Sequence, residues 1–130
     1  DQFHTFNMFD CQAWFARDVI MQKIKIPDNA EVENDINKWV SMEEKLENPD
    51  QMIDFQTEYT KELHSLSDYP EINFELIRKH FKEWEHHKVE DIMTYRNKSF
   101  SSPVTGSVAP VHHTPWESAM DDSLKTFLNK

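Results

Sequence analysis

Histidine is the most evident source of chemistry in this sequence, with seven among 130 residues. Glu83 and His86 have the Glu-x-x-His spacing that places two ligands on one helix face in di-iron carboxylate proteins. Such a site needs a second Glu-x-x-His pair and two more inward carboxylates, and the sequence has no second pair. We therefore expect Glu83 and His86, with the neighbouring His80 and His87, to form a charged, solvated helix face that binds no metal.

A second histidine pair and the single cysteine give equally weak signals. His112 and His113 are adjacent in an extended segment, so their rings point to opposite sides and are expected to anchor a loop. Cys11 lies among aromatic residues inside a predicted helix, where a buried and inert thiol is the usual outcome. One cysteine also excludes an internal disulfide and a four-cysteine zinc site.

Two features near the ends of the helical region can contact a cofactor. A helix that starts shortly after Phe3 presents free N–H groups and positive potential, which suit the electron-rich edge of a flavin ring. Arg96 stands at the entrance to a loop-rich segment, where an arginine can pair with a phosphate. On the residues alone, a surface salt bridge is the better explanation of Arg96.

Charge and composition exclude several classes of protein. The chain has 24 acidic against 14 basic residues, which argues against a nucleic-acid surface and against attachment to anionic membranes. It contains no apolar run long enough to span a bilayer and no signal-peptide pattern, so we predict a soluble, cytoplasmic protein. Gly106 is the only glycine, which rules out a Gly-rich dinucleotide turn or P-loop within these residues.

Helix signals dominate the elements that must position these residues. We predict a helix that starts near Asn7 or Asp10 and ends at about residue 23, with Phe9, Ala13 and Ile20 on one apolar face. Further helices are expected over about 29–47, from 49 to about 66, and from 73 toward 92. A loop-rich segment follows over 96–115, and a short helix over about 118–128.

The predicted organisation is a mainly α segment with a loop-rich tail. We divide it into a first part at 1–23, a helical layer at 24–95 and a tail at 96–130. The first nine residues include Phe3, Phe6, Met8 and Phe9, an apolar stretch that a free terminus would expose to water. We therefore expect the rest of a larger protein to cover it.

Several long strings of the sequence are similar to one known family. Over essentially its whole length the chain resembles the C-terminal third of bacterial flavin-containing monooxygenases of the trimethylamine-oxidising type. The strings that carry the resemblance are DQFHTFNMFDCQAWFARDVI at 1–20, DYP at 68–70, EWEHHK at 83–88, IMTYR at 92–96, TG at 105–106 and APVHHTPW at 109–116.

This resemblance implies a particular context for the chain. The family has an α/β flavoprotein fold, in which an FAD domain contains an inserted NADP domain, each with its own Gly-rich motif. Both motifs would lie in a missing N-terminal part, so the 130 residues would be the C-terminal part of this two-dinucleotide-domain fold. We expect residues 1–23 to return to the FAD domain and residues 96–130 to reach toward the NADP domain. The complete enzyme is expected to be a homodimer.

The resemblance also implies roles for four residues. Asp1 matches a catalytic position beside the nicotinamide and the substrate pocket, Gln2 and Thr5 match FAD contacts, and Arg96 matches an NADP contact. Phe3 stands where the family pattern has a tryptophan. The implied reaction oxidises trimethylamine to its N-oxide with NADPH and oxygen, through a flavin C4a-hydroperoxide, and the fragment alone would be inactive.

Two alternatives belong to other classes. One is a free-standing helical interaction module that has lost its cofactors, which the apolar first residues argue against. The other is a di-iron helical bundle, for which the second ligand pair is missing.

Overall fold

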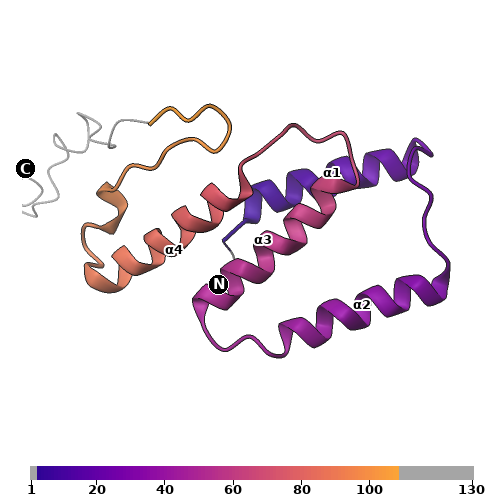
Figure 1. Cartoon of the computed structure of the whole chain (residues 1–130), viewed down its shortest axis with the longest axis horizontal. Coiled ribbons are helices and arrows are strands. Elements are labelled where there is room, and N and C mark those ends of the chain that lie inside the picture. Colours follow the sequence, from indigo (N-terminus) through magenta and orange to yellow (C-terminus); the bar gives the residue numbers. More distant parts are fainter. Residues whose placement is uncertain (1–2, 109–130) are drawn as a thin grey trace, which may run out of the picture.

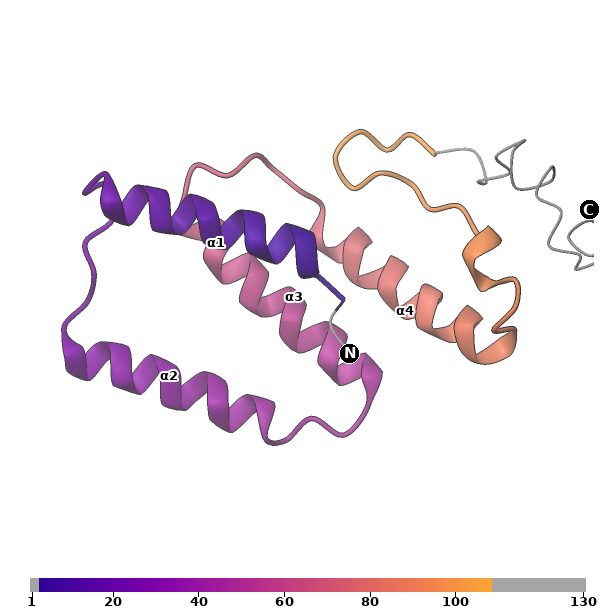
Figure 2. The ribbon, with the colours of Figure 1, turned by 180° about the vertical axis from the view of Figure 1, so that it is seen from behind.

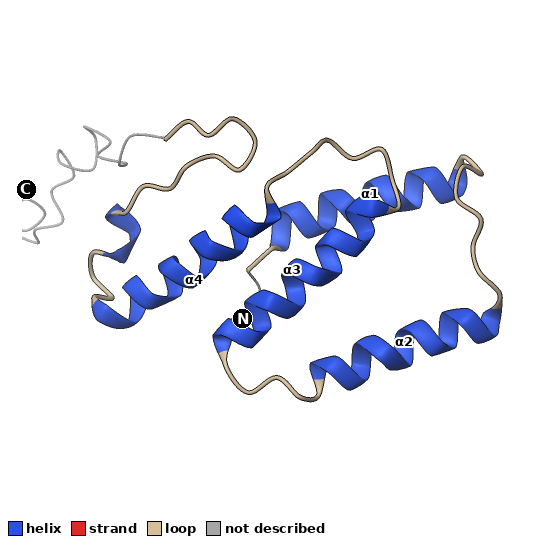
Figure 3. Cartoon of the chain, in the orientation of Figure 1, coloured by secondary structure: helices blue, strands red, loops and turns tan. Residues whose placement is uncertain are grey.

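The computed structural model describes residues 3–108, and these residues form four α-helices joined by loops (Figures 1 and 3). The elements are α1 (Thr5–Ile20), α2 (Asn29–Glu43), α3 (Pro49–Ser65), α4 (Phe74–Glu90) and the short 3₁₀ helix η1 (Tyr95–Asn97). The described residues include no named strand, only an isolated antiparallel bridge between Ser101 and Val108. The prediction of a mainly α segment is confirmed for this part of the chain.

Three of the helices begin where the sequence predicts, because a capping side chain stands at each start. The side chain of Asp28 accepts a hydrogen bond from the backbone N–H of Glu31. The side chain of Glu31 accepts one from the backbone N–H of Asp28, which completes a capping box. Asn48 caps α3, with proline at its first position, and Asn73 caps α4 in the same way. These contacts span three residues and are readable from sequence.

Helix α1 begins earlier than predicted. It starts at Thr5, so Asn7 and Asp10 lie inside the helix and do not cap it. His4 occupies the cap position without a side-chain cap, and the side chain of Gln56 on α3 accepts the N–H groups of Phe3 and His4 instead. These two N–H groups precede the first turn, so Gln56 fixes the backbone that enters α1 and does not cap the helix. A contact more than fifty residues away in the sequence could not be predicted from local signals.

Helix α3 is the centre of the arrangement, with α1 and α4 packed along it (Figure 2). Its buried face consists of Ile53, Gln56, Thr57 and Thr60. Helix α2 has no buried residue and meets α3 mainly through Trp39, whose ring contacts Phe55 and Tyr59 edge-on. The apolar side chains of α2 are therefore only partly covered by the described residues.

Ion pairs join α3 to α4 along their exposed edge. Arg78 bonds Glu58 and lies 3.5 Å from a carboxylate oxygen of Asp54, while Lys82 donates to Asp54 at 2.8 Å. Such part-exposed pairs each contribute little, roughly 0–1 kcal/mol. They align the helices more than they stabilise them.

The apolar face predicted for α1 exists but lies on the exposed side of the helix. Phe9 is 52% exposed and Ile20 is 79% exposed, whereas Cys11 and Asp18 on the opposite side are buried against the chain. With about 3.6 residues per turn, the two sets lie roughly 180° apart around the helix. The residues described here therefore cover only the more polar side of α1.

The described part of the loop-rich tail runs from η1 to Val108. Ser102 accepts the N–H of Gly106, whose φ of 73° suits glycine, and donates its own N–H to Ser107. The backbone carbonyl of Pro103 accepts the N–H of Asn73, which ties this loop to the start of α4. The irregular segment predicted from residue 96 is thus confirmed as far as 108. His112, His113 and the final helix predicted over 118–128 lie outside the described residues.

Candidate functional site

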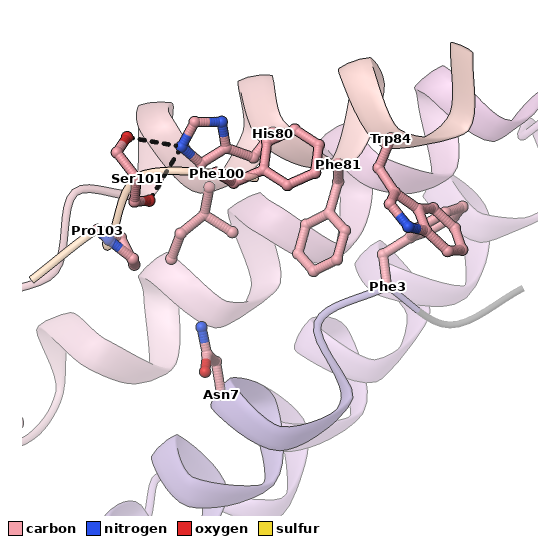
Figure 4. Close-up of a pocket in the computed structure, with 9 residues that line it drawn as sticks. Phe3, Asn7, His80, Phe81, Trp84, Phe100, Ser101 and Pro103 are labelled. Atoms are coloured by element: carbon pink, nitrogen blue, oxygen red, sulfur yellow. Dashed lines mark hydrogen bonds between the residues drawn. The ribbon is translucent and has the colours of Figure 1, made fainter. Parts of the chain in front are cut away.

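A cavity of about 510 Å³ lies between the start of α1, one face of α4 and the loop at 100–103 (Figure 4). Most of its wall is apolar, and aromatic rings from three separate segments meet there. The lining residues are Phe3, Asn7, Ile77, His80, Phe81, Trp84, Phe100, Ser101 and Pro103. A site with this lining suits a small ligand that is largely apolar.

One face of α4 supplies half of the cavity wall. Ile77, Phe81 and Trp84 recur at helical spacing and point to the same side as His80. The ring of Trp84 contacts the ring of Tyr95 edge-on at 5.2 Å, and the ammonium of Lys88 lies 5.3 Å from its centroid. Contacts on the far side of Trp84 therefore hold its indole in place at the cavity.

Phe3 forms the wall opposite α4. It is buried, and its ring meets the edge of Phe81 at a centroid distance of 5.8 Å. Figure 4 shows the Phe3 side chain beside Trp84 at one end of the cavity. Phe3 departs from the tryptophan of the family pattern but leaves this part of the wall aromatic.

His80 anchors the loop that closes the third side. Its Nε2 lies 3.1 Å from both the carbonyl oxygen and the hydroxyl of Ser101, and its ring packs against Phe100 at 5.0 Å. Nδ1 lies 3.5 Å from a carboxylate oxygen of Glu83. The histidine that sequence analysis placed on a solvated face is thus a loop anchor at the cavity.

The remaining histidines of α4 pair with a carboxylate on their own helix. His86 and His87 both approach Glu90, at 3.1 Å and 3.4 Å. Among residues 3–108 no three His, Cys, Asp or Glu side chains come together as a metal site.

Cys11 is fully buried against α3, as predicted for an inert thiol. Burial, together with the charge of Asp10, raises its pKa to about 11. The thiol therefore stays protonated at neutral pH and is a poor nucleophile.

Asp18 near the end of α1 and Asp10 in its first half make further contacts that hold the helix. Burial alone would raise the pKa of Asp18, but Arg17 and Lys23 outweigh this effect and hold the pKa below its usual value. The hydroxyl of Tyr69 donates to Asp10 at 2.6 Å. These contacts fix the helix whose first residues border the cavity.

The structure places two of the four residues for which the resemblance implies a role. Asp1 and Gln2 lie outside the described residues. Thr5 is in the first turn of α1, between the lining residues Phe3 and Asn7. Arg96 lies in η1 with its guanidinium 4.6 Å from the ring centroid of Tyr95, whose ring contacts the cavity residue Trp84.

Arg96 is exposed, and within the described part of the chain its guanidinium forms no ion pair. An arginine without a carboxylate partner is available to a phosphate. Both expectations for Arg96, a phosphate contact and a surface salt bridge, stay predictions.

Sequence reasoning missed the residues that form the cavity. Phe81 and Trp84 have the i, i+3 spacing of an apolar helix stripe, which is also the pattern of ordinary core residues. Phe100 sits in a loop without periodicity. The aromatic enrichment of the stripe was the only usable signal, and it does not distinguish a cavity from a core.

Together these features show that residues 3–108 form a helical segment with an aromatic cavity, and that the described residues leave an apolar face of α1 exposed. No described helix combines the length and apolar character needed to cross a membrane. No family model matches the chain.

Comparison with known proteins shows which longer proteins contain a similar segment. The chain is 88% identical over its whole length to a trimethylamine monooxygenase of Pelagibacter sp. strain HTCC7211, and 51% identical to one of Methylocella silvestris. It matches the crystal structure of Tmm from the same Pelagibacter strain with a TM-score of 0.86 and 88% identity, over 98% of the chain. The chain spans 29% of the length of these relatives. It corresponds to a segment of the trimethylamine monooxygenases.

Proposed function

We propose that this chain is the cavity-forming segment of an NADPH- and FAD-dependent monooxygenase that oxidises trimethylamine and similar small tertiary amines to their N-oxides. The observation that carries the proposal is the 88% identity over all 130 residues to a protein named trimethylamine monooxygenase. Identity at this level over a whole segment is strong support for a shared reaction. The FAD group, when bound, supplies the activation of oxygen.

The cavity supports the proposed substrate class. Phe3, Phe81 and Trp84 present aromatic rings, which attract methylated amines through apolar contact and, when the amine is protonated, through cation–π interaction. The described lining contains no carboxylate, so it favours a small, weakly hydrogen-bonding substrate over a polar one.

The chain can contribute single contacts to the cofactors but no dinucleotide-binding fold. Its single glycine excludes a Gly-rich phosphate turn, so both dinucleotide folds belong to the remainder of the longer protein. The start of α1 has no side-chain cap and no acidic residue in its first turn, which fits the electron-rich edge of a flavin. We propose that Gln2 and Thr5 contact FAD there, that Arg96 binds an NADP phosphate, and that catalytic Asp1 lies beside the nicotinamide and the substrate.

The exposed apolar face of α1 supports the same picture. Phe6, Phe9, Ala13 and Ile20 form a face that water would otherwise contact. We propose that the remaining length of the protein, the part that carries both dinucleotide folds, packs on this face. This favours a monooxygenase segment over a free-standing interaction module. The division at residues 23 and 95, the homodimer and the cytoplasmic location belong to the same proposal.

The proposal is tested on the complete protein. We expect a visible flavin spectrum and formation of trimethylamine N-oxide that requires both NADPH and oxygen. Trp84→Ala should raise KM for trimethylamine about tenfold, since loss of one aromatic contact costs roughly 1–2 kcal/mol.

Trp39→Ala is the matched control, because Trp39 contacts Phe55 and Tyr59 and does not line the cavity. Its KM should stay within about twofold of wild type. Absence of flavin from the folded protein would overturn the proposed reaction, and equal KM values for the two variants would remove the cavity from substrate binding.

A further inference from the structure

Gln56 makes two buried hydrogen bonds across a long stretch of sequence. Its side-chain oxygen accepts the backbone N–H of Phe3 at 2.8 Å and that of His4 at 3.3 Å. Both N–H groups stand just ahead of α1, where no side chain of the helix itself provides a cap. Gln56 therefore fixes the backbone that enters α1 from a different helix.

Thr57 contacts the side chain of His4, the residue after Phe3. Its hydroxyl donates its only hydrogen to the carbonyl of Ile53 at 2.7 Å, so the contact at 2.9 Å with His4 requires Nε2 of His4 to be the donor. Nδ1 of His4 has no partner among the described residues. The orientation of this buried ring therefore depends on Thr57.

Both tethered residues support rings of the cavity wall. Phe3 is itself a wall residue, and the ring of His4 packs against the ring of Phe81 at a centroid distance of 4.8 Å. Phe3 and Phe81 are also in edge contact with each other. Gln56 and Thr57 are not among the lining residues, so α3 supports these two rings from outside the cavity.

We propose that Gln56 is a positioning residue for the substrate cavity, because it holds the backbone of Phe3 and thereby sets where the Phe3 ring meets the substrate. Thr57 and His4 do the same for Phe81. This inference rests on the proposed function, since the placement of Phe3 matters to catalysis only when the cavity binds the amine.

The physical argument is that a hydrogen bond fixes direction where apolar packing does not. Without the oxygen of Gln56, two buried N–H groups lose their acceptor, and the backbone at Phe3 must move to find another. A shift of the ring enlarges the cavity on one side and loosens the hold on a small substrate. Misplacement of about 1 Å in an active site is enough to lower catalytic efficiency strongly.

The experiment compares three variants of the complete, flavin-loaded protein. Gln56→Met removes the acceptor at similar volume, and Gln56→Glu restores an acceptor oxygen at the same place. Thr60→Val is the matched control: Thr60 is buried on the same face of α3, and its hydroxyl donates to the carbonyl of Gln56 without touching the Phe3–His4 segment.

For Gln56→Met we expect KM for trimethylamine to rise about tenfold, the equivalent of one lost hydrogen bond. More hydrogen peroxide should be released per NADPH consumed, while flavin content and the rate of flavin reduction by NADPH stay within about twofold of wild type. Gln56→Glu should recover most of the KM. Thr60→Val should lower the thermal midpoint without changing KM.

Two results would overturn the inference. If Gln56→Met keeps a wild-type KM and peroxide yield, Gln56 does not position the cavity. If Thr60→Val changes KM as much as Gln56→Met at an equal loss of thermal midpoint, the effect is general destabilisation. A wild-type protein that does not oxidise trimethylamine would instead refute the proposed function, so the two failures are distinguishable.

Discussion

The two sides of α1 differ in a way that is unusual for a small helical segment. The side that packs on α3 carries His4, Cys11 and Asp18, which are buried and partly polar, whereas the side that faces away carries Phe6, Phe9 and Ile20, which are exposed. A helix of an independent domain normally has the reverse arrangement, with its apolar face toward the core.

Such a difference is expected when the two sides of a helix pack against different partners. Hydrogen bonds and ion pairs to Thr57, Arg17 and Lys23 satisfy the polar side within the chain. The apolar side has no cover among the described residues, and the chain spans only 29% of the length of its relatives. We interpret the first side as internal and the second as the interface with the remainder of the protein.

The largest loss of stability is expected when a charge is placed on the apolar side of α1. Ala13 and Ala30 are both exposed helical residues, on α1 and in the first turn of α2. In the complete protein Ala13→Glu should bury an unpaired carboxylate and cost several kcal/mol, roughly 3 or more. Ala30→Glu should change stability by about 0.5 kcal/mol or less.

The measurement is the thermal midpoint and the flavin content of both purified variants. Ala13→Glu should lower both values, and Ala30→Glu neither. Equal behaviour of the two variants would show that water, and not protein, covers this side of α1 in the complete enzyme.

A smaller effect is expected on the polar side. Thr57→Val keeps the shape of the side chain but removes the acceptor for Nε2 of His4, which leaves a buried N–H unpaired. The cost should be about 1–3 kcal/mol. Thr57→Ser keeps the hydroxyl and should cost less, so chemical denaturation of the two variants separates the hydrogen bond from packing. A Thr57→Ser loss as large as that of Thr57→Val would assign the effect to the methyl group.

The smallest effect is the pH dependence that His4 contributes. Burial, reinforced by the positive charge of Arg78, lowers the pKa of His4 to about 4. The ordinary pKa of histidine is about 6.5. Below that pH His4 is protonated in the unfolded state and stays neutral in the folded state, so the free energy of unfolding decreases between about pH 6.5 and 4.

The decrease should approach about 1.4 kcal/mol per pH unit and should vanish in His4→Gln. Thermal midpoints of the wild type and this variant, compared at pH 7, 6 and 5, measure it. Parallel curves for the two proteins would mean that His4 titrates normally.

Local features of the fold were predictable because their causes are local. Asp28, Asn48 and Asn73 cap helices through bonds to residues three positions away, and the observed helices begin beside them. Phe55 and Gln56 are neighbours on α3, and helical spacing alone does not decide which of the two lies on its buried face. The structure buries Gln56 and leaves Phe55 partly exposed, an outcome that apolar character alone would not select.

The sequence by itself determined the helical class, three helix starts, the inert Cys11 and the resemblance that led to the family, because each depends on short-range bonds or on residue identity. Only the tertiary structure decided where α1 begins, which of its sides is internal, and which aromatic rings form a cavity. Those outcomes depend on contacts such as that between Gln56 and Phe3, which lie 53 positions apart. No periodicity encodes such a contact, because it exists only once the helices have packed.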